Sequence, residues 1–273
     1  MEEGRNGILF MKRDFKYIYG PVSSWRLGVS LGIDPISRQE KVCTFDCVYC
    51  QLGKTSLLSD TREDFVAVRD IMREMVLMPS VKIDFITFAG RGEPTLAKNL
   101  GQMISAIKTI RKERVAVITN ASLLDREDVQ NDLLWADLVV AKLDACSDDL
   151  FKKINQPMEE IKFDRVLNAL QSFRRIFTGK LALQIMFIEQ NKAYVKEIVE
   201  LVRTINPDEV EINTPLRLCK VKPLRPETMQ EITAYFNGFK SISVYEAKKI
   251  KVDSISKIET LKRRGKNIEA KSY

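Results

Sequence analysis

From about residue 80 onward, short apolar runs rich in Val, Ile and Phe alternate with longer amphipathic stretches. The short runs predict strands at 82–88, 115–119, 138–144, 181–188 and 209–214. Between them, apolar residues three and four positions apart predict helices, for example around 100–110 and 195–202. The strands are mostly apolar without strict alternation, as in parallel strands covered on both faces. We therefore expect an α/β fold with a parallel sheet.

The same pattern extends to both ends of the chain. Residues 26–33 predict a sixth strand, and 65–78 a helix after a long loop. Residues 241–245 add a candidate edge strand, and 253–264 a terminal helix. Six β/α units make an incomplete barrel, and no linker or change of composition precedes residue 246. We expect an N-terminal extension (1–18), one barrel domain (19–246) and a basic tail or helix (247–273).

Composition narrows the class of protein. Of the 273 residues, 45% are hydrophobic and 30% charged, which excludes a disordered or fibrous chain. The net charge is +7, but nine basic against four acidic residues fall between 246 and 273, which favours a basic tail, as a solvated terminal helix, over a basic binding face. No run resembles a secretory signal or a bilayer span, so we expect a cytoplasmic protein without membrane contact.

The chain has no histidine, which excludes catalytic triads built on imidazole and zinc sites with histidine ligands. Its five cysteines are an odd number, so free thiols or metal ligands are expected rather than a disulfide framework. Two of them, Cys146 and Cys219, follow predicted strand ends, where a free thiol is more often incidental than functional.

The other three cysteines, Cys43, Cys47 and Cys50, lie within eight residues on the loop after the first predicted strand. Thiolates at this spacing can converge on one metal centre, although a structural zinc would need a fourth ligand. A four-iron, four-sulfur cluster held by three thiolates would keep one iron open for another ligand.

The CxxxCxxC spacing, with Tyr49 before the last cysteine, resembles the radical S-adenosylmethionine (SAM) superfamily. The segments YGPV (19–22), RLG (26–28) and SLGID (30–34), followed by a C–YCQLG loop, resemble its short members related to wyosine-type tRNA synthases. The resemblance runs from about residue 19 to 217. It implies a partial (β/α)6 TIM-like barrel that carries a 4Fe-4S cluster and S-adenosyl-L-methionine.

A second motif follows the strand at 82–88. Glycines let a backbone approach a ligand closely, and a carboxylate beside them accepts hydrogen bonds from an ammonium group. The resemblance makes this segment, Gly90, Arg91, Gly92 and Glu93, the element that holds the methionine amino group of the cofactor.

Polar residues at the other strand ends complete the predicted site. Asn120 and Ser122, after the strand at 115–119, and Lys142 and Asp144, at the end of the strand at 138–144, resemble family positions near the cofactor's ribose and carboxylate. Gln184 and Asn213 lie on the next two predicted strands. The predicted cofactor-binding set is Tyr49, Gly90, Arg91, Gly92, Glu93, Asn120, Ser122, Lys142, Asp144, Gln184 and Asn213. The cluster ligands are Cys43, Cys47 and Cys50. No catalytic residue is assigned.

The activity implied by the resemblance is reductive cleavage of SAM to a 5′-deoxyadenosyl radical, which takes a hydrogen atom from a substrate. Modification of a tRNA base is one hypothesis for that substrate. The alternatives are activation of a partner protein, a small-molecule pathway, or an iron–sulfur and SAM-binding regulatory module without catalysis. An electron donor such as ferredoxin or flavodoxin is the expected partner.

Overall fold

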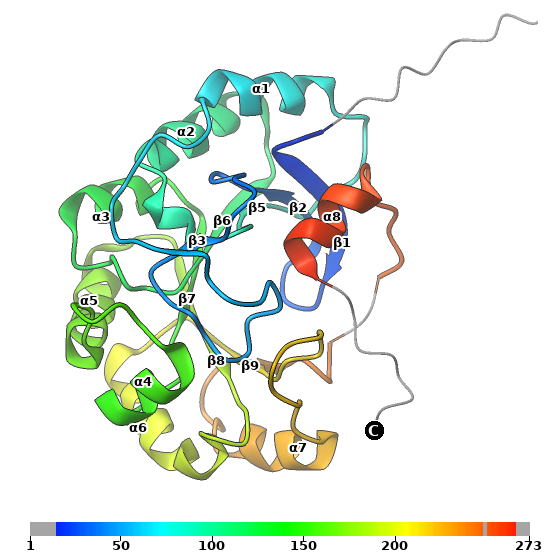
Figure 1. Ribbon diagram of the computed structural model, residues 1–273. Coiled ribbons are helices and arrows are strands. Elements are labelled where there is room, and N and C mark those ends of the chain that lie inside the picture. Colours follow the sequence, from blue (N-terminus) through cyan, green and yellow to red (C-terminus); the bar gives the residue numbers. More distant parts are fainter. Residues whose placement is uncertain (1–14, 248–249, 266–273) are drawn as a thin grey trace, which may run out of the picture.

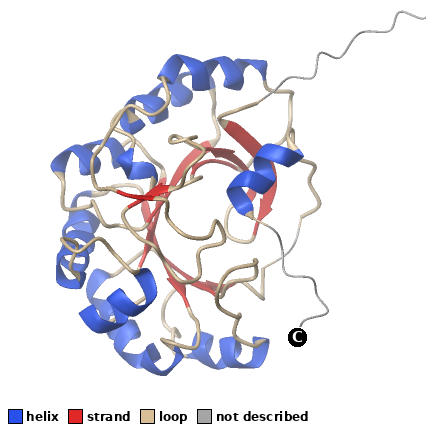
Figure 2. Cartoon of the chain, in the orientation of Figure 1, coloured by secondary structure: helices blue, strands red, loops and turns tan. Residues whose placement is uncertain are grey.

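The structure is a computed structural model that describes residues 15–247 and 250–265. Most of the predicted N-terminal extension and more than a third of the predicted tail lie outside these residues. The main sheet has the strand order β1-β2-β5-β6-β7-β8-β9-β10, and every neighbouring pair is parallel except β1 with β2. The sheet curls into an incomplete barrel with helices on its outer face (Figures 1 and 2).

The strands of this sheet are β1 (Ile18–Ser24), β2 (Gly28–Ile33), β5 (Phe85–Phe88), β6 (Arg114–Thr119), β7 (Leu138–Lys142), β8 (Lys180–Met186), β9 (Glu209–Asn213) and β10 (Ser241–Ser243). A separate two-stranded sheet pairs β3 (Val42–Cys43) with β4 (Leu57–Leu58). The helices are α1 (Val68–Leu77), α2 (Leu100–Ile110), α3 (Glu127–Leu133), α4 (Asp148–Asn155), α5 (Phe163–Ile176), α6 (Val195–Ile205), α7 (Pro226–Ala234) and α8 (Lys257–Arg264). Two short 3₁₀ turns are η1 (Pro94–Leu96) and η2 (Lys192–Tyr194).

The predicted partial barrel is confirmed, with differences at element ends. All six predicted parallel strands are present, and the candidate edge strand pairs in parallel with β9. The sequence pattern did not predict β1, which runs antiparallel to β2. The Gly20–Pro21 pair inside β1 argued against a strand, because proline donates no ladder hydrogen bond. A shift of register between Tyr19 and Val22 accommodates this pair, and β1 lies at the edge of the sheet.

The terminal helix is shorter than predicted and is not solvated on all sides. It begins after Ser256, whose side chain accepts a hydrogen bond from the Glu259 amide. It lies across β1 (Figure 1), and the Arg263 side chain is only 3% exposed. The expectation of a solvated helix is therefore wrong for this face, because Arg263 reaches a buried carboxylate.

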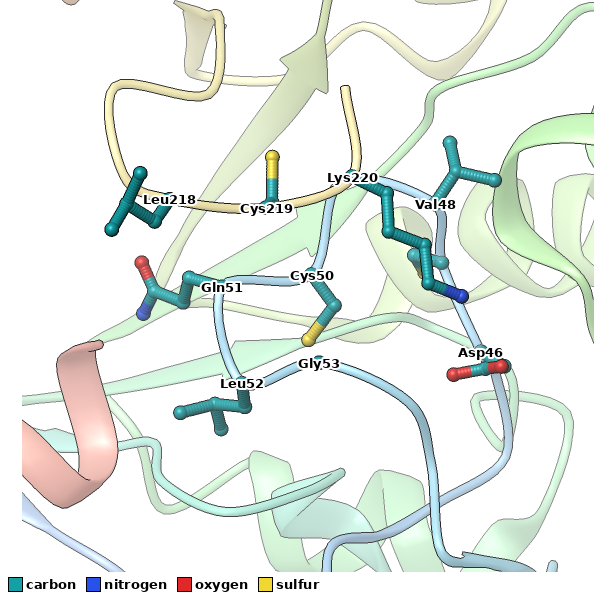
Figure 3. A pocket seen from close by; sticks show the side chains of 10 residues that line it. Asp46, Val48, Cys50, Gln51, Leu52, Gly53, Leu218, Cys219 and Lys220 are labelled. Atoms are coloured by element: carbon teal, nitrogen blue, oxygen red, sulfur yellow. The ribbon is translucent and has the colours of Figure 1, made fainter. Parts of the chain in front are cut away.

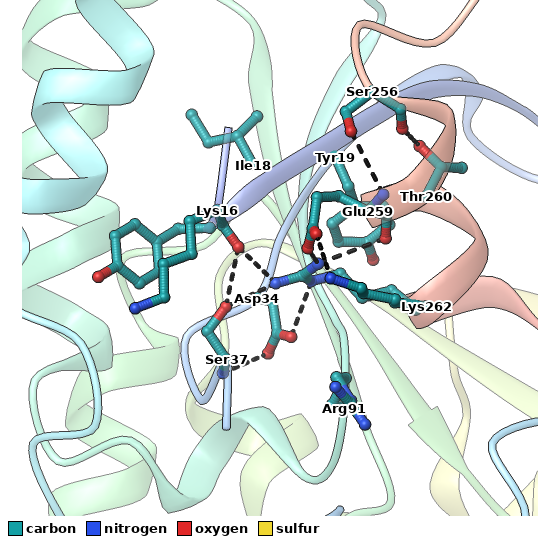
Figure 4. A network of polar contacts seen from close by, with 12 residues as sticks. Lys16, Ile18, Tyr19, Asp34, Ser37, Arg91, Ser256, Glu259, Thr260 and Lys262 are labelled. Carbon is teal, nitrogen blue, oxygen red and sulfur yellow. Dashed lines mark hydrogen bonds and ion pairs between the residues drawn. The ribbon is translucent and has the colours of Figure 1, made fainter. Parts of the chain in front are cut away.

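That carboxylate belongs to Asp34, at the end of β2. Arg263 Nε lies 2.9 Å from Asp34 Oδ2, and the same guanidinium donates to Ser37 Oγ at 2.7 Å (Figure 4). Both charged side chains are almost fully buried. The ion pair joins two segments 229 residues apart in the chain, and it fixes α8 over the open seam of the barrel.

The hydrophobic core lies between the sheet and the outer helices, with a second small cluster around Leu27, Phe85 and Val140. Within the described residues, no helix has both the length and the apolar character needed to cross a bilayer.

Candidate functional site

The three clustered cysteines lie on the segment that follows β2, over the carboxyl ends of the parallel strands. Cys43 ends β3, and the Cys50 amide donates to the Cys47 carbonyl at 3.0 Å, which tightens the turn between these two cysteines. Cys47 and Cys50 line a cavity of about 380 Å³ that opens between this loop and the segment after β9 (Figure 3). The loop therefore brings thiols to the edge where ligands bind in parallel β/α folds.

Two amide side chains donate to the cysteine sulfurs. Asn120 Nδ2 lies 3.6 Å from Cys43 Sγ, and Asn155 Nδ2 lies 3.6 Å from Cys47 Sγ. Burial raises the pKa of the Cys47 thiol to about 12 and also raises that of Cys43. Such N–H donors favour the thiolate over the thiol. The thiolate is the form that binds metal.

The cysteine arrangement suits a cluster better than a single ion. Within the described part of the chain, no three Cys, Asp or Glu side chains lie close enough to share one ion. A four-iron cluster presents a separate iron to each thiolate and so accepts sulfurs that do not converge on one point. The donor set therefore fits an iron–sulfur cluster.

The glycine-rich segment after β5 pairs directly with the cysteine strand. The Val42 amide donates to the Arg91 carbonyl at 3.3 Å, and the Glu93 amide donates to the Val42 carbonyl at 3.1 Å. A Cβ on Gly92 would collide with the Val42 carbonyl oxygen, so only glycine permits this approach. The two sequence motifs are thus parts of one structure.

Glu93 is buried and accepts four hydrogen bonds. Its carboxylate accepts from the Thr95 amide (3.1 Å) and hydroxyl (2.8 Å), from Thr119 Oγ1 (2.6 Å) and from the Asn120 amide (2.7 Å). Burial raises the pKa of Glu93, and these donors oppose that shift. The side chain therefore joins the Gly-rich loop to the end of β6, and its direct contact with the cofactor stays a prediction.

Asn120 and Ser122 lie against the cysteine strand rather than in open space. Asn120 Nδ2 donates to Thr44 Oγ1 at 2.7 Å, and its Oδ1 accepts from the Ser122 amide at 3.0 Å. The Ser122 hydroxyl lies 2.8 Å from that of Thr44 and is buried. Thr44, which no sequence motif singled out, links the cysteine strand to β6.

A second polar network surrounds Asp144 at the end of β7. The Tyr49 hydroxyl donates to Asp144 Oδ2, which also accepts from Asn155 at 2.8 Å. Lys142 Nζ lies 3.1 Å from Asp144 Oδ1 and over the Tyr49 ring. The Met186 amide donates to the same Oδ1 at 2.7 Å. These contacts fix Tyr49, the residue before Cys50, against the sheet.

The network continues across the inside of the barrel. Lys142 Nζ donates to Gln184 Oε1 at 3.3 Å, and Gln184 Nε2 donates to Glu211 Oε2 at 3.0 Å. Glu211 is 1% exposed and lies 3.3 Å from Arg26 Nε. Burial raises the pKa of Glu211, and Arg26 opposes that shift. Glu211 could have been recognised from the sequence, because it is an acidic residue at a buried position of a predicted strand. It was not among the predicted site residues.

The remaining predicted residues are less connected. Asn213 ends β9 with a half-buried side chain, and its carbonyl accepts from the Phe187 amide at 2.7 Å. The Arg91 side chain donates to the Gln39 carbonyl. A Cβ on Gly90 would collide with the Asp34 carboxylate, so this glycine makes room for the buried ion pair with Arg263.

All five cysteines are free thiols. Cys219 lines the same cavity as Cys50, but in Figure 3 its side chain points away from that of Cys50, and its Sγ lies 3.2 Å from the Val221 carbonyl. The clustered cysteines therefore remain a set of three.

Residues 41–202, more than half of the chain, match the family model of the radical SAM superfamily. A UPF0026 protein of Synechocystis sp. is 41% identical over 218 residues, which cover 80% of this chain and 81% of that protein. Among solved structures, Streptococcus suis SuiB bound to S-adenosylmethionine gives a TM-score of 0.58 at 16% identity, over 75% of this chain and 48% of SuiB. Archaeal TYW1 gives 0.55 at 14% identity, over 81% of this chain and 74% of TYW1. The chain thus spans about half of SuiB. Both structures share its fold, and the family match makes this chain a member of the radical SAM superfamily, an enzyme that uses S-adenosylmethionine and a 4Fe-4S cluster.

Proposed function

We propose that the chain cleaves SAM reductively and directs the resulting radical at a nucleotide of tRNA. The observation that carries the SAM chemistry is the pairing of the cysteine strand with the GRGEP segment through Val42, Arg91 and Glu93. This pairing sets the three thiols beside backbone groups that glycine leaves accessible.

Each cysteine of the loop has one role in this proposal. Cys43, Cys47 and Cys50 would each hold one iron of a 4Fe-4S cluster, which would leave one iron without a protein thiolate and available to SAM. When bound and reduced by an external electron donor, the cluster would supply one electron to the sulfonium of SAM; cleavage of the carbon–sulfur bond would then give methionine and a 5′-deoxyadenosyl radical able to take a hydrogen atom from the substrate.

The remaining residues orient the cofactor and exclude water. We assign the backbone of Gly90 to Gly92 to the methionine amino group, and Lys142 and Asn213 to polar groups of the cofactor. Glu93 positions the Gly-rich loop, because its carboxylate is occupied by Thr95, Thr119 and Asn120. A site that works through position and a dry cavity needs no histidine.

A second group of predicted site residues acts through neighbours. Asp144 holds Tyr49 and Lys142 in place, and Gln184 joins Lys142 to Glu211. Ser122 supports Thr44. In the proposal these are positioning residues, because each contacts a side chain that in turn lies against the cysteines or the cofactor.

tRNA is the substrate we favour. The support is the fold shared with archaeal TYW1, the segments that resemble wyosine-type tRNA synthases, and the basic surplus after residue 246. A partner protein, a small molecule, or regulation without catalysis are the outcomes that binding experiments would reveal instead.

We also propose an electron donor and a cellular location for this protein. A carrier such as ferredoxin or flavodoxin would deliver the electron at the exposed side of the cysteine loop, where Lys220 borders the cavity. Five free thiols suit the reducing cytoplasm.

The first experiment measures 5′-deoxyadenosine released from SAM by anaerobically reconstituted protein with dithionite. We expect release by the wild type and by Cys219→Ala, and loss of release when Cys43, Cys47 and Cys50 are all replaced by Ala. Continued release by the triple variant would contradict the assignment.

The second experiment measures binding of unmodified tRNA at several salt concentrations. For each phosphate neutralised, the slope of log K against log salt is about −0.7 to −0.9. A salt-insensitive affinity, or stable capture of one protein instead, would overturn the choice of tRNA while leaving SAM cleavage intact.

A further inference from the structure

Three arginines from distant parts of the chain lie close enough together for their charges to act on one another. Arg26 precedes β2, Arg217 follows β9, and Arg264 ends α8. Arg217 Nη1 donates to the carbonyls of Arg264 and Gly265 at 3.0 and 3.4 Å. The Arg26 guanidinium reaches inward to Glu211. The docking of α8 thus completes the cluster.

The positive charges of this cluster are not balanced. Burial, followed by the charges of Arg264 and Arg26, lowers the pKa of Arg217 to about 10. Burial also lowers the pKa of Arg264, and the Arg26 charge adds to that shift. Within the described residues, neither Arg217 nor Arg264 forms an ion pair with a carboxylate.

Tyr19 does not supply the missing negative charge. Burial and the nearby Asp34 raise the pKa of Tyr19 to about 12, so its hydroxyl stays neutral and donates to the Ala89 carbonyl at 3.1 Å. Glu211 is the one carboxylate that faces Arg26 closely, at 3.3 Å, yet the buried Arg26 Nε has no hydrogen-bond partner within the described part of the chain. Glu211 therefore offsets the charge of Arg26, whereas Arg217 and Arg264 have no carboxylate partner within the described residues, which is unfavourable unless a ligand supplies the negative charge.

The cluster borders the cysteine cavity. Arg217 directly precedes Leu218, Cys219 and Lys220, which line that cavity together with Cys50. On the other side, Gly265 abuts the Gln51 carbonyl, where an added Cβ would come within 2.8 Å. A molecule held by these arginines would therefore lie beside the place where the proposed function generates its radical.

We propose that Arg26, Arg217 and Arg264 bind an oxyanion of the substrate, a phosphate or a carboxylate. The planar guanidinium presents paired N–H donors that match two oxygens of such a group. This inference rests on the proposed function, which makes the bound molecule the substrate of the enzyme. Binding of an anion to the arginines can be tested without turnover.

The experiment uses the cluster-reconstituted protein with SAM and measures thermal unfolding and calorimetric binding. The probes are pyrophosphate and malonate, each compared with chloride at equal ionic strength. Arg264→Gln is the test variant, because its side chain has no ion pair in the described structure. Arg175→Gln removes the same charge from an exposed site at the end of α5 and is the control.

We expect one probe to stabilise the wild type and Arg175→Gln, and its affinity to fall at least tenfold in Arg264→Gln and Arg217→Gln. Preference for pyrophosphate would identify a phosphate, and preference for malonate a carboxylate. Equal stabilisation of all variants, or none in the wild type, would overturn the proposal. So would weaker SAM binding in Arg264→Gln, because the arginines would then serve the cofactor. Absence of 5′-deoxyadenosine release in the wild type would instead contradict the proposed function.

Discussion

At the residue scale, Gly32 of the SLGID segment and Gly90 of the GRGEP segment are explained by the side chains that lie against them. A Cβ on Gly32 would fall within the Tyr19 ring, and one on Gly90 within the Asp34 carboxylate. The segments YGPV and SLGID therefore depend on each other: the tyrosine of one packs on the glycine of the other.

Gly32→Ala tests this contact. We expect it to lower the free energy of unfolding by about 1–3 kcal/mol, because the Tyr19 ring must move to admit a methyl group. Urea unfolding measures the change. The effect should shrink when Tyr19 is also replaced by Ala, and an equal loss in the two backgrounds would assign it to the glycine backbone.

Glu211 predicts a dependence of stability on pH. Burial raises its folded-state pKa above the ordinary value of 4.5, so protonation favours the folded state. This contribution to the free energy of unfolding is fully present below the pKa that Glu211 has in the unfolded state. It is lost as pH rises through the pKa that Glu211 has in the folded state. Because one carboxyl binds one proton, the loss cannot be steeper than about 1.4 kcal/mol per pH unit.

The measurement is urea unfolding of wild type and Glu211→Gln from pH 4 to 7. The unfolding free energy of the wild type minus that of the variant should fall as pH rises. Glu160→Gln, at an exposed position, should follow the wild type. A constant difference between wild type and Glu211→Gln would show that the carboxyl titrates normally.

At the element scale, α8 is held on the barrel by a buried ion pair together with hydrogen bonds to Gly20 of β1 and to Arg217. Its exposed face carries Ile258 and Leu261, and its inner face places Arg263 on Asp34. Near-complete burial of both charges makes this contact sensitive to loss of either partner.

Arg263→Met should therefore cost about 3–5 kcal/mol of unfolding free energy, since it leaves Asp34 charged and buried. Lys262→Met, whose side chain is 52% exposed, should change stability by about 0.5 kcal/mol or less. Hydrogen exchange should show faster exchange in α8 of the first variant only. Unchanged exchange in Arg263→Met would mean that other contacts hold the helix.

At the scale of the whole molecule, we expect the bound cofactors to stabilise the folded chain. A ligand that binds only the folded state at 100 times its dissociation constant adds about 2.7 kcal/mol to stability. SAM should therefore raise the melting temperature of reconstituted protein in a concentration-dependent way.

The variant in which Cys43, Cys47 and Cys50 are Ala should lack this SAM-dependent rise in melting temperature, and Cys146→Ala should retain it. Calorimetry of the wild type and the two variants under anaerobic conditions measures the melting temperature with and without SAM. A normal rise in the triple variant would mean that SAM binds without the cluster.

The sequence by itself determined the strands, the β/α order and the two motifs, because periodicity and residue spacing are local properties of the chain. Cys43 to Cys50 and Gly90 to Glu93 were found this way. The sequence did not indicate β1, whose proline argued against a strand and whose place depends on pairing with β2.

Only the tertiary structure decided which polar residues meet. Asn155 lies beside Cys47 although 108 residues separate them, and Arg263 reaches Asp34 across 229 residues. The arginine cluster likewise joins the start of β2, the end of β9 and α8. Such contacts depend on how the sheet curls and on which helix covers its open seam, and no local pattern in the chain encodes either.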